Sequence, residues 1–87
     1  MSREYSILFK PSARKELFSL PDQAISAIEE KIDVLISNPR PHGCKKLSGS
    51  INEYRIRIGN YRVVYTVSDD TLIVYVIKIA HRKNVYK

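Results

Sequence analysis

Three arginines within one short stretch are the residues of this sequence best suited to binding phosphate. Arg55, Arg57 and Arg62 fall within eight consecutive positions. A guanidinium group presents paired N–H donors that match two phosphate oxygens, and it keeps its charge at every physiological pH. These residue types favour the clamping of an anion over proton transfer, because arginine does not act as a general base.

The positive charge of the chain is concentrated in its second half. The net charge is +6, yet residues 1–37 carry five basic and six acidic residues, so residues 38–87 hold a net charge of +7. A one-sided basic surface is typical of proteins that bind polyanions. Nucleic acid is the first candidate partner, and an acidic protein is the second.

Several other kinds of chemistry are excluded by residue counts and spacing. One cysteine and two histidines do not make a standard zinc site, and no glycine-rich phosphate loop is present. Acidic residues are sparse in the basic half, which argues against a two-metal nuclease. We therefore expect neither a metal nor a cofactor.

Two hydrophobic periodicities, a helical one followed by an alternating one, indicate the elements that must position the arginines. In chain order they predict a strand over residues 4–9, a helix from an N-cap at Ser12 to Pro21, a second helix from an N-cap at Asp22 to Asn38, a loop over residues 40–50, and strands over residues 53–58, 61–67 and 72–80. The expected fold is a single α+β domain over residues 1–87, β-α-α-β-β-β in order. Two N-terminal helices would pack on one face of a small, mostly antiparallel four-stranded sheet.

Gly59-Asn60 is a two-residue hairpin signal that sets the pairing of the arginine strands. It predicts Arg57 opposite Arg62, with Arg55 on the same face and the helices covering the other face. Like charges directly opposite each other destabilise a sheet, so this arrangement favours an anionic ligand. The alternative is a solvated strand face whose arginines point into water.

The last predicted strand is apolar on both faces, which is typical of a central strand. Its alternation would place Ile73, Tyr75, Ile77 and Ile79 on the arginine face as an apolar interaction patch. Continued to the end of the chain, the same alternation would place His81 on the arginine face and Arg82 on the other. Arg82 would then join the arginines only if the regular strand has ended.

The chain resembles the RelE/ParE superfamily of bacterial and archaeal toxins over nearly its whole length. The resemblance is carried by Lys46-Leu47-Ser48-Gly49, Glu53-Tyr54-Arg55-Ile56-Arg57, Tyr61-Arg62-Val63-Val64-Tyr65, His81-Arg82 and Val85-Tyr86. The second-strand basic pair, the late arginine and the final tyrosine make the chain similar to the RelE branch. One departure is that well-known members carry lysine where Arg55 and Arg57 stand here.

The RelE resemblance implies a ribosome-dependent endoribonuclease that cuts mRNA in the A site. Attack by the ribose 2′-OH on the adjacent phosphate would need no metal. Carried over by motif, the expected catalytic residues are Arg57, Arg62, Arg82 and Tyr86, and Arg55 is expected to position the RNA backbone. His81, which the family pattern does not require, is a further catalytic candidate, and Lys45, Lys46, Lys83 and Lys87 are further RNA-binding candidates. Tyr86 is the favoured general base and His81 the second candidate, a choice that stays open at this point. His42 is expected to be a surface residue.

The same resemblance implies partners and a cellular location. A cognate antitoxin with an acidic, amphipathic segment would neutralise the toxin, and operator DNA would be bound only through the antitoxin complex. No segment predicts a secretory signal or a membrane span, so a cytoplasmic location is expected. Two other functions remain open: a ParE-like inhibitor of DNA gyrase, and a decayed toxin that only binds its antitoxin and operator DNA.

Overall fold

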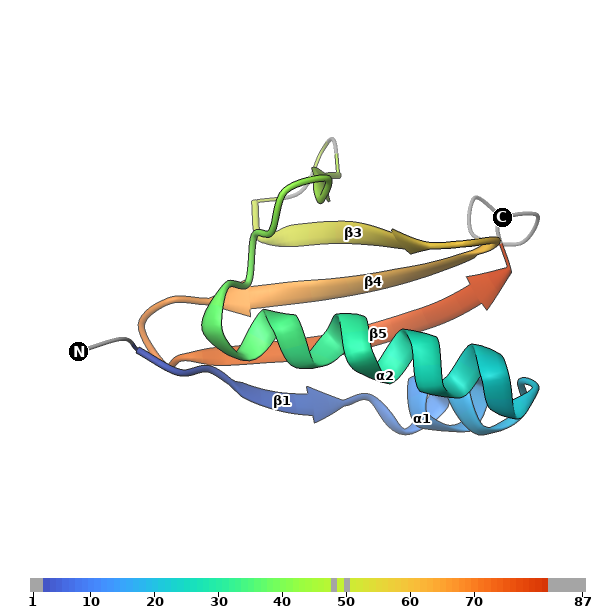
Figure 1. The fold of residues 1–87 in the computed structure, drawn as a ribbon. Coiled ribbons are helices and arrows are strands. Elements are labelled where there is room, and N and C mark those ends of the chain that lie inside the picture. The colour runs from blue at the N-terminus through green and yellow to red at the C-terminus, as the bar shows by residue number, and fades with distance from the viewer. Residues whose placement is uncertain (1–2, 48, 50, 82–87) are drawn as a thin grey trace.

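A computed structural model describes residues 3–47, 49 and 51–81 of the chain. Its elements form a sheet with two helices packed on one face (Figure 1). They are β1 (Ser6–Phe9), α1 (Pro11–Phe18), α2 (Asp22–Ser37), β2 (Lys45–Lys46), β3 (Glu53–Ile58), β4 (Tyr61–Ser68) and β5 (Ile73–His81). The predicted α+β class and the placement of both helices on one face are confirmed.

The sheet has five strands in the order β1-β5-β4-β3-β2. β1 runs parallel to β5, and the remaining neighbours are antiparallel. The prediction of four strands missed β2, which lies in the predicted loop over residues 40–50. Because β2 is only two residues long, it is too short to show the alternation that identifies a strand in a sequence.

Both helices begin earlier than their predicted N-caps allow, α1 by two residues and α2 by one. α1 starts at Pro11 with Lys10 as its N-cap, and α2 starts at Asp22 after Pro21. No side chain caps either N-terminus, so the predictions of Ser12 and Asp22 as caps are wrong. Proline's fixed φ suits the first helical turn, and Asp22 instead places its negative charge in the first turn of α2.

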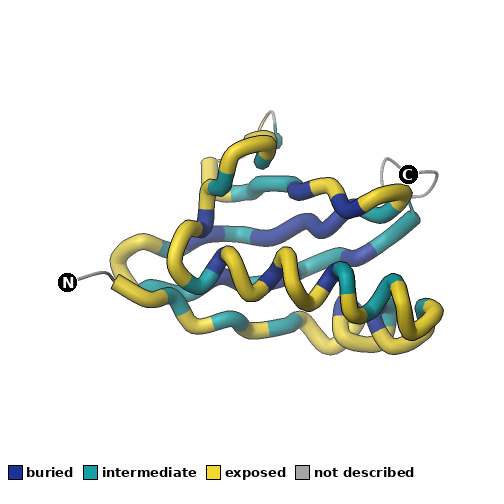
Figure 2. Tube along the Cα trace, in the orientation of Figure 1, coloured by how far each residue is buried: buried dark blue, intermediate teal, exposed yellow. Residues whose placement is uncertain are grey.

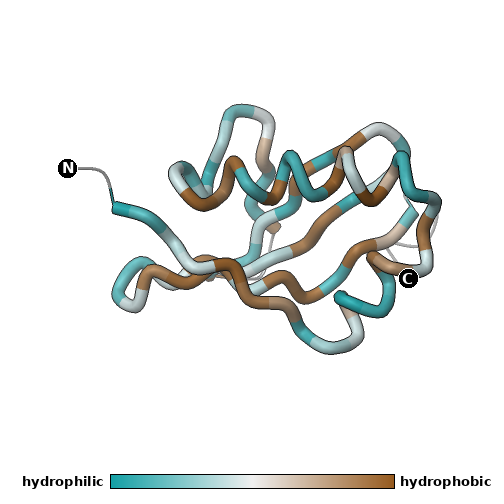
Figure 3. Tube along the Cα trace, turned by 60° about the horizontal axis from the view of Figure 1, so that its bottom comes forward, coloured by the Kyte–Doolittle hydropathy of each residue, from teal (hydrophilic) through white to brown (hydrophobic). Residues whose placement is uncertain are grey.

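The hydrophobic core lies between the helices and the covered face of the sheet, as the buried positions of the central strands and of α2 show (Figure 2). Its fully buried members include Ile28 and Leu35 of α2 and Val63 and Tyr65 of β4. Apolar residues recur in bands along the helices and run along the central strands (Figure 3). Neither helix in the described part of the chain is long and apolar enough to cross a membrane.

Candidate functional site

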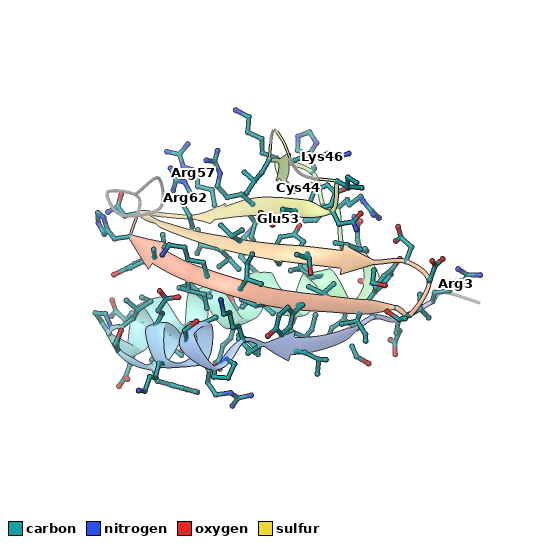
Figure 4. The ribbon with its side chains drawn as sticks, turned by 180° about the vertical axis from the view of Figure 1, so that it is seen from behind. Arg3, Cys44, Lys46, Glu53, Arg57 and Arg62 are labelled. Carbon is teal, nitrogen blue, oxygen red and sulfur yellow. The ribbon has the colours of Figure 1, made fainter. Side chains whose placement is uncertain are left out.

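The hairpin of β3 and β4 places three arginines on the uncovered face of the sheet. Arg57 is paired with Arg62, and Arg55 with Val64, which confirms the predicted register. Gly59 adopts a φ of +57° in the connecting turn, a conformation that a tight hairpin requires and that glycine adopts without strain. Figure 4 shows Arg57 and Arg62 together at the end of the sheet where β5 terminates.

A β-bulge in β5 reverses the alternation that the sequence predicted for the end of this strand. Tyr65 pairs with Val76, whereas its neighbour Val64 pairs with Lys78, so one extra residue, Ile77, lies between them. Ile79 is consequently turned into the core and is only 2% exposed. The prediction that Ile79 lies on the arginine face is therefore wrong, because a bulge inserts a residue that unbroken alternation cannot anticipate.

The bulge also moves His81 away from the arginine face. His81 is paired with Tyr61, and the two rings meet edge to face with their centroids 5.7 Å apart. Tyr61 packs against the core on the helix-covered face, so His81 shares that face. The predicted position of His81 beside the arginines is wrong for the same reason as that of Ile79. The premise that assigned Arg82 to the opposite face, unbroken alternation along β5, is wrong as well.

The same bulge brings a lysine that the sequence analysis did not single out onto the arginine face. Lys78 is paired with Val64, which stands opposite Arg55, which in turn stands opposite Lys45 of β2. Two cation rows therefore cross the uncovered face: Lys45, Arg55 and Lys78 in one row, and Arg57 and Arg62 in the next. The rows are two residues, roughly 7 Å, apart along the strands. Lys46 is exposed and pairs with Tyr54, outside both rows.

The two arginines of the second cation row differ strongly in burial. Arg62 is 8% exposed, and its Nη1 donates hydrogen bonds to the carbonyl oxygens of Tyr61, at 3.2 Å, and Gly59, at 3.5 Å. Arg57 is exposed. One guanidinium is thus held in place by the backbone of the hairpin turn, while the other extends toward solvent. Such a pair can combine fixed geometry with adaptable contact to an anion.

A carboxylate from α1 anchors the end of β5 next to the cation rows. Glu16 Oε1 accepts a hydrogen bond of 3.0 Å from the backbone N–H of Ile79, and its Oε2 lies 3.8 Å from Lys78 Nζ. β1 pairs with β5 only up to Val76, so this N–H lies beyond the paired part of the strand edge. Glu16 therefore satisfies a backbone donor that the sheet leaves without a strand partner, and it orients Lys78.

An apolar patch adjoins the cation rows on the uncovered face. Ile73 and Tyr75 of β5 are half-buried there, as the sequence predicted. Leu8 of β1, which is paired with Tyr75, extends the patch and is 48% exposed. Ile77, also predicted for this patch, is the bulge residue and is half-buried.

A polar network at the other end of the sheet was not foreseen from the sequence. Arg40 donates two hydrogen bonds to Asp69, of 3.1 and 2.8 Å, and a third from Nε to the Tyr54 hydroxyl. The Tyr5 hydroxyl donates to Asp69 at 2.7 Å. These bonds lower the pKa of the Asp69 carboxyl to about 2, chiefly through Arg40 and then through Tyr5, and they raise the pKa of the Tyr5 hydroxyl.

The polar network secures the sheet, and its Tyr54 packs against the core on the face opposite to the cation rows. It ties the loop after α2 to the β4–β5 turn, and Tyr65 strengthens this link by donating a 2.8 Å hydrogen bond to the Pro39 carbonyl. Burial raises the pKa of the Tyr65 hydroxyl well above its usual range, so this hydroxyl remains a donor. Arg40 and Asp69 are 29 positions apart, and no local pattern connects them.

The remaining predicted site residues lie outside the described part of the chain. They are Arg82, Lys83, Tyr86 and Lys87. Within the described residues, no group of three His, Cys, Asp or Glu side chains could hold a metal ion. His42 is exposed, as expected.

Two helices on one face of a five-stranded sheet, with the cation rows on the other, define a small α+β protein of the RelE/ParE toxin type. The family model of the ParE toxin of type II toxin–antitoxin systems matches residues 7–86. The chain therefore belongs to this toxin family, within the RelE/ParE superfamily.

Known relatives and solved structures agree on the RelE branch. The chain is 40% identical to the putative toxin RelE1 of Methanocaldococcus jannaschii over 84% of each sequence. Its fold superposes on the archaeal RelE–RelB complex of Pyrococcus horikoshii with a TM-score of 0.83, at 29% identity, covering 94% of this chain and 99% of that one. The isolated Escherichia coli RelE toxin gives a TM-score of 0.81 at 30% identity, covering 94% and 90% of the two chains. The protein is thus a RelE-like toxin of a type II toxin–antitoxin system.

Proposed function

We propose that this toxin is a ribosome-dependent endoribonuclease that cleaves mRNA in the A site. The observation that carries the proposal is the pairing of Arg57 with Arg62 in register on an uncovered sheet face, beside Arg55 and Lys45. Close cations without intervening carboxylates in their rows favour a bound phosphodiester. The relatives named RelE add support through sequence identity and fold.

In the proposed reaction, the ribose 2′-oxygen attacks the adjacent phosphorus and the bond to the 5′-oxygen breaks. The products are a 2′,3′-cyclic phosphate and a 5′-hydroxyl, which takes up a proton as it leaves. Arg57, Arg62 and Arg82 would stabilise the extra negative charge of the pentacoordinate phosphate. Arg55, with Lys45, Lys46, Lys83 and Lys87, would hold the RNA backbone. The reaction needs no metal or cofactor.

The arginines cannot remove the 2′-OH proton, so another group must act as the general base. We assign this role to Tyr86, whose phenolate the surrounding positive charge would favour. His81 is the second candidate, but its contact with Tyr61 on the helix-covered face argues against a direct role. The ribosome and the mRNA would complete the geometry of the site, so free RNA would be cut poorly.

The proposed antitoxin partner suits the uncovered face. Similar RelE toxins have been solved as complexes with RelB. An acidic, amphipathic segment of a cognate antitoxin would cover the apolar patch of Leu8, Ile73 and Tyr75 and neutralise the neighbouring cation rows. Operator DNA would be bound only through that complex. We propose that the toxin acts as a single domain in the cytoplasm.

An in vitro translation assay with purified toxin tests the proposed activity. We expect new mRNA ends within codons, mapped by primer extension, and their loss in Arg82→Ala and Tyr86→Phe. His81→Gln should retain most of the activity if Tyr86 is the base. Lys15→Ala, at an exposed position of α1, is the matched control and should cleave like the wild type.

The ParE description of the matching family model favours one second candidate, inhibition of DNA gyrase. Undiminished translation with intact mRNA, combined with loss of DNA supercoiling by gyrase, would establish that alternative. Failure in both assays with intact antitoxin binding would indicate a decayed toxin.

A further inference from the structure

A small cavity lies at the outer edge of β3, between that strand, α2 and the loop that precedes β2. Its volume is about 100 Å³, and it is lined by Lys31 and Val34 of α2, residues 41–43 of the loop, and Ile56 and Arg57 of β3. β2 pairs only with Tyr54 and Arg55, so the strand edge next to the cavity is not covered by β2.

Positive charge dominates this cavity. Lys31, His42 and Arg57 contribute basic groups from α2, the loop and β3, and none of the lining residues in the described part of the chain is acidic. Two of the four acidic residues of α2, Glu29 and Asp33, line a different groove against β1.

Lys31 and its basic neighbours are not engaged in neutralising contacts with carboxylates. Lys31 has only apolar residues three and four positions away on α2, so no ion pair can form along the helix. In residues 3–47, 49 and 51–81, the ion pairs are those of Arg40 with Asp69 and Lys78 with Glu16. Neither pair includes a residue of this cavity.

The size of the cavity limits what can bind in it. Sites for metabolites and cofactors usually enclose roughly 300–1,000 Å³. A volume of about 100 Å³ has room for only a few water molecules, each occupying roughly 30 Å³ in the liquid. A single phosphate group matches both this size and the charge, since arginine binds phosphate through two N–H donors and lysine binds it as a point charge.

We propose that this cavity binds a second backbone phosphate of the RNA whose scissile phosphate lies on the cation rows. The inference rests on the proposed ribonuclease function and adds a binding site to it. Arg57 connects the two places, because it is paired with Arg62 in the cation rows and also lines the cavity. Lys31 and His42 act as substrate-positioning residues that fix the register of the RNA, and they take no part in proton transfer.

The salt dependence of RNA binding tests the inference without requiring cleavage. The probe is a short, fully 2′-O-methylated RNA, and its affinity is measured by fluorescence anisotropy at several salt concentrations. For each phosphate contact that is lost, the slope of log K against log salt should fall by about 0.7. We expect this change for Lys31→Gln, a weaker affinity for His42→Gln, no change for Lys15→Gln, and full recovery of the slope in Lys31→Arg.

Cleavage kinetics in the translation assay provide the second arm. Lys31→Gln should raise KM roughly tenfold, the loss expected for one charge-assisted contact, and leave kcat within about twofold. If the wild type cleaves mRNA while the Lys31 and His42 variants keep wild-type KM and salt slopes, the second phosphate site is overturned and the ribonuclease function stands. If the wild type does not cleave, the ribonuclease function fails and the salt slopes alone decide whether the cavity binds RNA.

Two further outcomes would assign the cavity to another ligand. Saturable binding of inorganic phosphate, followed through the His42 imidazole NMR signals, combined with unchanged RNA affinity in the variants, would make it a site for free phosphate and overturn the inference. Weakened antitoxin binding in Lys31→Gln with unchanged RNA affinity would overturn it in favour of a protein contact.

Discussion

Arg57 and Arg62 stand directly opposite each other on adjacent strands, and both belong to the uncovered face of the sheet. Like charges that face each other on adjacent strands weaken the strand pair by about 0.2–1 kcal/mol relative to neutral residues. The free toxin therefore carries a cost in stability at the place where the proposed reaction requires positive charge. A bound phosphate would remove that cost, which links the stability of the hairpin to its ligand.

Replacing Arg57 with glutamine should stabilise the free protein while weakening its activity. We expect the free energy of unfolding in urea to rise by about 0.2–1 kcal/mol at low salt, with a smaller gain at high salt. Cleavage in the translation assay should fall at least about tenfold, the loss of one charged hydrogen bond. Arg57→Lys keeps the charge and serves as the control. A destabilised Arg57→Gln variant would show that the arginine pair is not repulsive.

The bulge predicts that two isoleucines of the same strand differ sharply in their contribution to stability. Ile79 is 2% exposed in the core, whereas Ile73 is half-buried on the uncovered face. Ile79→Ala should lower the free energy of unfolding by about 2–5 kcal/mol, because it removes buried methylene groups and leaves a cavity. Ile73→Ala should cost clearly less. Equal losses measured by urea denaturation would contradict the reversed alternation after Ile77.

Glu16 should contribute to the stability of the fold through its acceptor oxygen more than through its charge. Glu16→Ala leaves the Ile79 N–H without its side-chain acceptor, a change that costs about 1–3 kcal/mol for a buried donor. Glu16→Gln keeps an acceptor oxygen and should retain most of the stability, although it loses the ion pair with Lys78. Amide exchange at Ile79 is the direct readout. It should accelerate in the alanine variant and stay slow in the glutamine variant.

The network of Arg40, Asp69 and Tyr5 should make the stability of the protein depend on pH in the acidic range. The pKa of Asp69 is lowered to about 2 in the fold, chiefly by the Arg40 hydrogen bonds, below the value of about 3.9 for an unfolded aspartate. A lowered pKa contributes stability that is fully present above about pH 4 and lost as the pH falls toward 2. Thermal melts of Asp69→Asn should show a weaker decline over this window. An unchanged decline would assign the acid sensitivity to other carboxylates.

Much of the architecture could be predicted because its determinants are local. Gly59-Asn60 and the alternation on either side of it predicted the full pairing of β3 with β4, including Arg57 opposite Arg62. The helical period of residues 22–37 predicted α2 and its buried face. Each of these signals depends on residues close together in the chain, where turn geometry and side-chain period leave few alternatives.

Other features could not be predicted because they depend on contacts between distant segments. The bulge at Ile77 places Lys78 beside the arginines and moves Ile79 and His81 to the covered face, although the sequence of β5 is apolar on both parities. In a segment that is apolar at both odd and even positions, no local sequence signal distinguishes a regular strand from a bulged one. The bulge is set by the pairing of β5 with β1 on one side and with β4 on the other.

By itself, the sequence determined the order of the elements, the basic character of the second half, the register of the arginine hairpin and the toxin family. The tertiary structure alone decided which residues after Tyr75 face the arginines. It also brought Arg40 to Asp69, and it formed the small cavity that Lys31 and Arg57 line together. The physical reason is the range of the interactions. Turns and periodicity act over a few residues, whereas bulges, ion pairs and cavities are set by how separate elements pack together.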